Sequence, residues 1–131
     1  MFARWSVLLV LSAGLLIAGC AGAPAEFKHG VLTDSQGMTL YTFDKDSAGS
    51  GRSACNGRCA GNWPPLSADA DAKAHGRYSV ITRDDGSRQW AYDGMPLYLW
   101  VKDKKPGDRT GDGVRGVWHV VKQPAREMGA Y

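Results

Sequence analysis

Short runs of apolar and β-branched residues, separated by glycine-rich polar turns, recur along the chain after residue 30. Runs of this length and composition predict β-strands. No window keeps the 3.6-residue apolar period of an amphipathic helix, and residues 68–75 form the single helical candidate. The expected strands are residues 31–34, 39–43, 78–83, 88–92, 97–101 and 117–121.

Two of these segments indicate how the strands are arranged. The sequence Asp84-Asp85-Gly86-Ser87 separates two expected strands and predicts a hairpin turn, since glycine tolerates the positive φ that tight turns require. Residues 97–101 are apolar at every position, which is typical of a central strand covered on both faces. The 17 glycines and 6 prolines among 131 residues agree with many turns and few helices.

The first twenty residues form a candidate targeting segment. An apolar segment at residues 5–17, preceded by Arg4, predicts a secretory signal peptide, because it is too short to span a bilayer comfortably. It continues into Leu16-Ile17-Ala18-Gly19-Cys20, which resembles the lipobox of bacterial lipoproteins. We therefore expect a lipid on the Cys20 thiol that anchors the protein to a membrane without spanning it. The alternative is an ordinary secretory signal that happens to contain a cysteine.

The chain also repeats itself. Residues 37–46 reappear in similar form at 94–103, and residues 61–66 reappear in the same order at 116–121. Two copies predict a paired domain with approximate two-fold symmetry, because neither half alone would bury much apolar surface. We expect one all-β domain of six to eight short antiparallel strands, built from two related halves.

This duplication and the signal define the expected layout of the chain. The signal peptide precedes a lipidated N-terminus, a short linker, the β domain and a flexible tail. The corresponding residues are 1–19 for the signal peptide, 20–29 for the lipidated N-terminus and linker, 30–123 for the single β domain (repeats at about 30–66 and 78–121) and 124–131 for the tail.

One doubled motif carries a resemblance to a known family. A tyrosine, an aromatic residue two positions later and an aspartate three further on occur as Tyr41, Phe43 and Asp46, and again as Tyr98, Trp100 and Asp103. With the lipobox, Cys55-x3-Cys59, Trp63-Pro64-Pro65-Leu66 and Pro106-Gly107-Asp108, the chain resembles the predicted bacterial lipoproteins called "secreted repeat of unknown function" over about residues 30–121. The resemblance implies a secreted, lipid-anchored repeat protein and assigns no catalytic residue.

The motif has a physical reading of its own. In a strand, the tyrosine and the aromatic residue lie on one face, and the aspartate follows near the strand exit. That aspartate can cap the following turn or accept a hydrogen bond from the equivalent tyrosine hydroxyl. We favour this tyrosine–aspartate clamp, since duplicated aromatic stripes belong more often to a core than to a binding site. The alternative is a ligand platform of aromatic rings with Asp46 and Asp103 at its rim.

The remaining cysteines offer a structural and a chemical interpretation. Outside the cytoplasm, Cys55 and Cys59 are expected to form a disulfide across the Asn56-Gly57 turn. The alternative is copper or thiol-redox chemistry, because soft sulfur ligands suit copper(I). The additional copper ligands would be drawn from Met38, Met95 and His119, with His29 and His75 as further candidates.

Other chemistry finds little support in the residues. Asp103, Asp108 and Asp112 could offer oxygen ligands to calcium, but they lack the usual calcium-loop spacing and a closing glutamate. No nucleophile elbow and no phosphate-binding glycine loop is present. The net charge of +3, without a run of like charges, argues against nucleic acid.

These observations lead to an expected function without catalysis and without a cofactor. Two long polar loops, residues 44–58 and 103–116, occupy equivalent places in the two copies. Loops held on a rigid scaffold are common binding sites. We therefore expect a lipid-anchored module of the bacterial cell envelope that binds an envelope partner through these loops. The alanine after Cys20 favours the outer membrane, facing the periplasm, if the host is Gram-negative.

Overall fold

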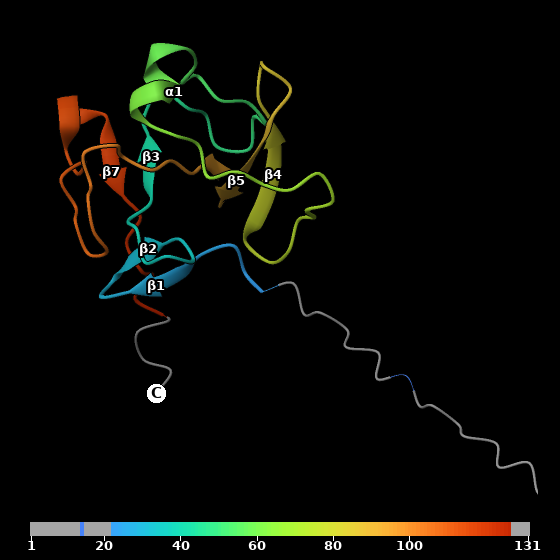
Figure 1. Cartoon of the computed structure of the whole chain (residues 1–131), viewed down its shortest axis with the longest axis horizontal. Helices are drawn as coiled ribbons and strands as arrows, with labels where there is room; N and C mark the ends of the chain where they lie inside the picture. Colours follow the sequence, from blue (N-terminus) through green and yellow to red (C-terminus); the bar gives the residue numbers. More distant parts are fainter. Residues whose placement is uncertain (1–13, 15–21, 127–131) are drawn as a thin grey trace, which may run out of the picture.

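The computed structural model describes residue 14 and residues 22–126, and its elements confirm the all-β class (Figure 1). The only helical segments among these residues are two short ones. Residues 68–75, the expected helical candidate, form an irregular segment with one turn at 70–71 instead. The elements in chain order are β1 (Glu26–Lys28), β2 (Val31–Thr33), β3 (Tyr41–Phe43), α1 (Arg58–Asn62), β4 (Tyr78–Thr82), β5 (Arg88–Tyr92), β6 (Met95–Pro96), η1 (Val114–Gly116) and β7 (Trp118–Val120).

The middle of the domain is an antiparallel arrangement to which both repeats contribute. Strand β3 pairs with β7, so that Tyr41 lies opposite Val120. On its other side, Tyr41 forms a bridge with Tyr98, with backbone N–H···O distances of 2.8 and 3.0 Å in the two directions. Tyr98 in turn bridges Pro65. The segment around Tyr98 is therefore central, as expected, with hydrogen bonds on both sides. The expected strand 97–101 is reduced to the bridge at Tyr98, and Val101 is 38% exposed, because the chain turns there.

Matching hydrogen bonds on either side of the Tyr41–Tyr98 bridge establish the approximate two-fold axis. The Asp44 N–H donates to the Val117 carbonyl at 2.8 Å. The equivalent bond in the other half runs from the Val101 N–H to the Asn62 carbonyl at 3.1 Å. Further from the bridge, the Leu32 N–H donates to the Val121 carbonyl and the Trp90 N–H donates to the Leu66 carbonyl, both at 2.9 Å. Thus the sequence repeat is also a structural repeat.

Each half adds a hairpin to this centre. The pair β1–β2 belongs to the first half, and the pair β4–β5 belongs to the second. The expected turn at 84–87 is present, with Gly86 at φ +85° and a 2.8 Å bond from Arg83 N–H to the Ser87 carbonyl. Strand β1 was not expected, because residues 20–29 were read as a linker; three residues with one partly buried phenylalanine give too little pattern to predict a strand.

The buried apolar side chains form two clusters. The first surrounds the Tyr41–Tyr98 bridge and holds most of the tryptophans. The second lies between the hairpins and is centred on Leu32, Leu40 and Leu97, which are fully buried. In Figure 1, α1 and the β1–β2 hairpin occupy opposite ends of the domain, and the described chain enters next to β1.

Two sequence interpretations fall wholly or partly outside the described residues. Cys20 and nearly all of the expected signal peptide lie at positions 1–13 and 15–21, and most of the expected tail lies at 127–131. Among the residues that the structure does describe, no helix has the length and apolar character needed to cross a membrane.

Candidate functional site

The two tyrosines and two aspartates of the repeated motif form hydrogen bonds between the repeats. Tyr41 Oη donates to Asp103 Oδ2 at 2.6 Å, and Tyr98 Oη donates to Asp46 Oδ2 at 2.6 Å. The tyrosines are 0% exposed and the aspartates 7%. Each tyrosine therefore binds the acid of the other copy, which the sequence pattern alone did not specify.

The second oxygen of each aspartate closes the loop that follows it. Asp46 Oδ1 accepts a 2.7 Å hydrogen bond from the Ala54 N–H. Asp103 Oδ1 accepts bonds from the Thr110 N–H at 3.0 Å and the Thr110 hydroxyl at 2.6 Å. Both roles considered for these acids, loop cap and tyrosine acceptor, are thus filled by the same carboxylate. The loops 44–58 and 103–116 are anchored to the core by buried charges.

Burial sets the protonation state of the two tyrosines. Loss of solvent, and next the hydrogen bond to a carboxylate, raise the pKa of Tyr41 and of Tyr98 well above the ordinary tyrosine value. A phenolate at either place would be desolvated and would face a negative carboxylate. Both hydroxyls therefore stay protonated donors, and neither is exposed to an external ligand.

The Tyr98 clamp continues to a buried arginine. Ser53 Oγ lies 2.7 Å from Tyr98 Oη and accepts a 3.0 Å hydrogen bond from Arg83 Nη1. Arg83 is 5% exposed, and its Nη1 also donates to Gln89 Oε1 at 2.6 Å. A chain of hydrogen bonds thus connects the buried Arg83 cation with the Asp46 carboxylate. The other clamp is completed differently. There the Gly111 N–H donates to Tyr41 Oη at 3.2 Å, at the place that the Ser53 hydroxyl takes beside Tyr98.

The sequence analysis missed Ser53, Arg83 and Gln89. One signal was available: Arg83 directly follows β4, two residues after the buried Ile81, so a continued period of two would place its side chain on the same inner side. An arginine at the end of a strand is ordinarily read as a solvated residue. Nothing in the sequence marks Ser53 or Gln89 as its partners.

Four aromatic rings stack in a ladder that alternates between the repeats. Ring centroids are 4.2 Å apart for Phe43–Trp118, 3.8 Å for Trp118–Trp63 and 4.0 Å for Trp63–Trp100. The central pair is nearly parallel, at 3°. Tyr41 meets Trp63 edge-on, and Tyr98 meets Trp118 in the same way. The two-fold axis therefore passes between Trp63 and Trp118, and the ladder forms the core of the first cluster.

A hollow of about 310 Å³ opens along one side of this ladder. Its apolar part comes from the ladder and from neighbouring side chains of η1 and β7. Its polar part includes three exposed cations, Lys45, Arg58 and Arg115. We call this hollow the ladder groove. It is lined by Phe43, Lys45, Arg58, Cys59, Asn62, Trp63, Trp100, Val114, Arg115, Val117 and Trp118.

The expected disulfide is present next to the groove. Cys55 and Cys59 are joined with a Cα–Cα distance of 5.2 Å, and Cys55 is fully buried. The bridge ties loop 44–58 to α1. Both sulfur atoms are bonded to each other, so neither offers the thiolate that the copper alternative requires.

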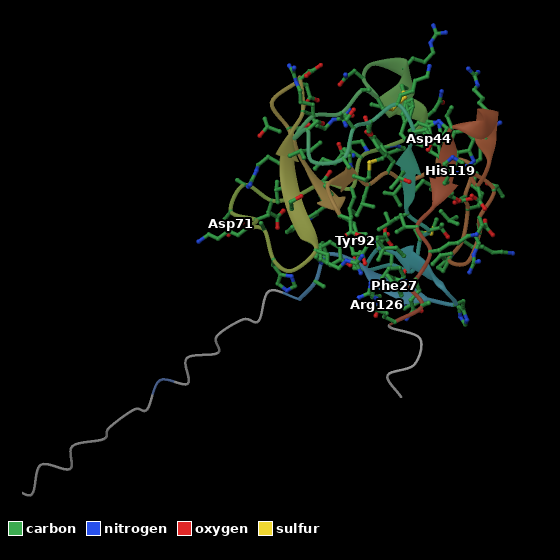
Figure 2. The ribbon with its side chains drawn as sticks, turned by 180° about the vertical axis from the view of Figure 1, so that it is seen from behind. Phe27, Asp44, Asp71, Tyr92, His119 and Arg126 are labelled. Atoms are coloured by element: carbon green, nitrogen blue, oxygen red, sulfur yellow. A yellow bond between two sulfur atoms is a disulfide. The ribbon has the colours of Figure 1, made fainter. Side chains whose placement is uncertain are left out.

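The other residues considered for a metal are spread over separate elements. His119 Nε2 lies 2.7 Å from Asp44 Oδ2 on the surface between β3 and β7 (Figure 2). Met95 belongs to β6, while Met38 precedes β3, His29 lies in the β1–β2 turn and His75 packs beside Tyr78. Within residues 22–126, no three His, Cys, Asp or Glu side chains come together as a metal site.

The three aspartates considered for calcium are also not gathered. Asp103 binds Tyr41 and Thr110, whereas Asp108 Oδ2 accepts the Lys104 N–H at 2.8 Å. Asp112 Oδ1 accepts the Val120 N–H at 3.1 Å. Asp103 and Asp108 thus bind within their own loop and Asp112 binds β7, and the three carboxylates do not gather into one group of ligands among the described residues.

Together these features define a two-repeat, all-β module whose halves are joined by exchanged tyrosine–aspartate bonds. A family model described as "Secreted repeat of unknown function" matches residues 25–67 and 79–122, and the chain belongs to that family. The two matches coincide with the two halves related by the axis. No curated protein and no solved structure matches the chain.

Proposed function

We propose that this protein is a lipid-anchored, non-catalytic module of the bacterial cell envelope, which binds another envelope component through loops 44–58 and 103–116. The observation that carries the proposal is the reciprocal clamp. Asp46 and Asp103 hold the two loops to one rigid core through buried hydrogen bonds. Loops fixed in this way lose little conformational entropy when they bind a partner.

The position of loop 44–58, next to α1, suits an anchored receptor, whereas loop 103–116 reaches back to the β1–β2 turn, where Arg109 Nη2 donates to the His29 carbonyl at 2.8 Å. The α1 end of the domain lies opposite β1, where the described chain begins (Figure 1). A lipid on Cys20 would therefore tether the molecule at the β1 end and leave the α1 end facing away from the membrane. In a Gram-negative host, we place the anchor in the outer membrane with the domain in the periplasm.

The proposal of a non-catalytic role rests on how the motif side chains are used. The hydroxyls of Tyr41 and Tyr98 are buried and already bonded. His119 is paired with Asp44 at the surface, where solvent screens the pair. The two tyrosine hydroxyls therefore serve the structure, and His119 with Asp44 forms an exposed surface pair between β7 and the end of β3.

Replacement of the lipidated cysteine tests the anchor. The wild-type protein is expected in the membrane fraction of the cell, and Cys20→Ser in the soluble or secreted fraction. The family description covers a secreted protein in either case. Equal distribution of the two forms would contradict the lipid anchor.

Site-specific photo-crosslinking in intact cells tests the binding surface. A photoreactive residue at the exposed Lys104, in loop 103–116, is expected to give a discrete adduct with one envelope component. The same photoreactive residue at position Asp71 serves as the control. Asp71 is exposed and lies on the β4 side of the domain, away from His119 and β7 (Figure 2). Equal adducts at both positions, or none at Lys104, would contradict the proposed surface.

A further inference from the structure

The ladder groove has the chemistry of a site for a polyanion, and we infer that it binds an acidic glycan strand through one negatively charged sugar. This inference rests on the proposed function and names the class of envelope component. The groove's volume of about 310 Å³ is at the lower end of ligand-binding pockets, which suits a single ring-sized group.

The stacking within the ladder determines what the groove can recognise. Trp63 has Trp100 on one face and Trp118 on the other, and Trp118 has Trp63 and Phe43. These two rings can therefore present only their edges to a ligand. Aromatic edges carry partial positive charge, whereas the faces carry partial negative charge. The floor of the groove favours an anionic group and offers no free face at Trp63 or Trp118.

The rim adds formal positive charge. Lys45, Arg58 and Arg115 line the groove, and within residues 22–126 none of them forms an ion pair. Asp44, the exposed acid beside Lys45 in the chain, is bonded to His119. Within the described residues these rim cations have no ion-pair partner, and a carboxylate or phosphate would complement them.

Positive charge continues beyond the groove along the second loop. Lys102 Nζ lies 5.7 Å from the Trp100 ring centre, and Lys104 and Lys105 follow at exposed positions. The Asp108 carboxylate offsets part of the Lys105 charge. The remaining cations together fit a ligand with repeated negative charges better than a single small anion. Single-stranded nucleic acid also carries repeated charge, but its binding sites rely on stacking bases on aromatic faces, which Trp63 and Trp118 do not offer. An acidic polysaccharide carries repeated negative charge and has no bases that must stack on an aromatic face.

Fluorescence titration provides the test. The full-length protein, held in a polyoxyethylene detergent that carries neither sugar nor charge, is titrated with polygalacturonate while tryptophan emission is recorded. We expect saturable binding that weakens as salt is added. Lys45→Gln and Arg58→Gln are each expected to weaken binding about tenfold, as for the loss of one charge-assisted contact of about 1.4 kcal/mol. Lys73→Gln, an exposed cation outside both loops and outside the groove, is the matched control and keeps wild-type affinity.

Three comparison polymers separate the possible outcomes. Fully methyl-esterified polygalacturonate has the same sugar backbone without the charge, and equal binding of it would overturn the role of the cations. Equal binding of polyglutamate or of a thymidine homopolymer would show charge recognition alone and overturn the glycan class. Unchanged binding in Arg58→Gln would overturn the groove as the site. Position-specific crosslinking at Lys104 without any binding of polygalacturonate would reject the glycan and leave the proposed function standing.

Discussion

Tyr41 and Tyr98 lie opposite each other across the approximate two-fold axis, joined by two backbone hydrogen bonds, and each hydroxyl donates to the acid of the partner repeat. Each repeat satisfies one oxygen of its own buried aspartate and depends on the other repeat's tyrosine for the second. A buried carboxylate without its hydrogen bonds is costly, so each half depends on the other for stability. Duplication has thus produced one cooperative domain instead of two independent ones.

The first prediction concerns alkaline pH. The raised pKa values of Tyr41 and Tyr98 mean that the folded state favours their protonated forms. Their stabilisation is complete below the unfolded tyrosine pKa of about 10 and is lost as the pH rises above it. We expect the free energy of unfolding to fall steadily as the pH rises above about 10, and phenolate absorbance of these two residues to appear only with unfolding.

The double variant Tyr41→Phe/Tyr98→Phe is the control for this pH effect. It is less stable at neutral pH, but its free energy of unfolding should change less over the same alkaline range. Parallel loss of stability in the wild type and the double variant would show that other groups cause the alkaline transition.

The second prediction concerns the close approach of loop 103–116 to the ladder. A Cβ at Gly111 would lie 2.9 Å from carbon atoms of Trp63 and of Tyr41. Gly111→Ala should therefore push the loop off the ladder, weaken the bond from the Gly111 N–H to Tyr41, and cost about 1–3 kcal/mol in a denaturant titration.

Gly61 offers a matched control for this substitution. It lies in α1, and a Cβ there meets no atom within 4 Å. Gly61→Ala should be neutral or stabilise by up to about 1 kcal/mol, because alanine favours a helix. If the two alanine variants were equally stable, the packing of loop 103–116 on the ladder would be refuted.

The third prediction concerns the three cysteines of the chain. A bridge between Cys55 and Cys59 and a lipid on Cys20 leave no free thiol. Thiol titration of the denatured protein should therefore detect none without reductant and two after reduction. One thiol before reduction and three after it would indicate an unlipidated Cys20, whereas two thiols in both states would contradict the disulfide.

Loss of the bridge should have a modest effect on stability. The closed loop is short, so chain entropy predicts a contribution of about 2 kcal/mol. Cys55→Ser/Cys59→Ser should lower the free energy of unfolding by about that amount without unfolding the domain at room temperature. Copper content that fell in parallel in this variant would favour the copper interpretation instead.

The sequence predicted the fold well because its signals are local. Alternating apolar runs, the Asp85-Gly86 turn and the repeat at residues 41–46 and 98–103 need no knowledge of distant contacts. The helix α1 was missed, since five residues around Cys59 are too few to show a helical period. Residues 68–75 carry helix-compatible composition but no apolar face that would pack on the core.

The functional surface was harder to predict for a different reason. The sequence placed a tyrosine and an aspartate in each repeat, but their exchange between repeats depends on how the halves dock. The same holds for the alternating ladder, in which Trp63 lies between Trp100 and Trp118. Arg83 was overlooked because only the folded chain brings Ser53 and Gln89 to its guanidinium.

The exchange of bonds between repeats is the central claim, and double-mutant cycles test it most directly. The single variants Tyr98→Phe and Asp46→Asn and the double variant are made, and the free energy of unfolding of each is measured by denaturant titration. We expect each single change to cost about 1.5–3 kcal/mol, the range for a hydrogen bond to a buried charged group. The pair Tyr98–Asp46 should show a coupling energy above about 1 kcal/mol, as should Tyr41–Asp103. The same-repeat pairs Tyr41–Asp46 and Tyr98–Asp103 should be additive within about 0.5 kcal/mol. Strong coupling within a repeat, with additivity between repeats, would contradict the exchanged clamp.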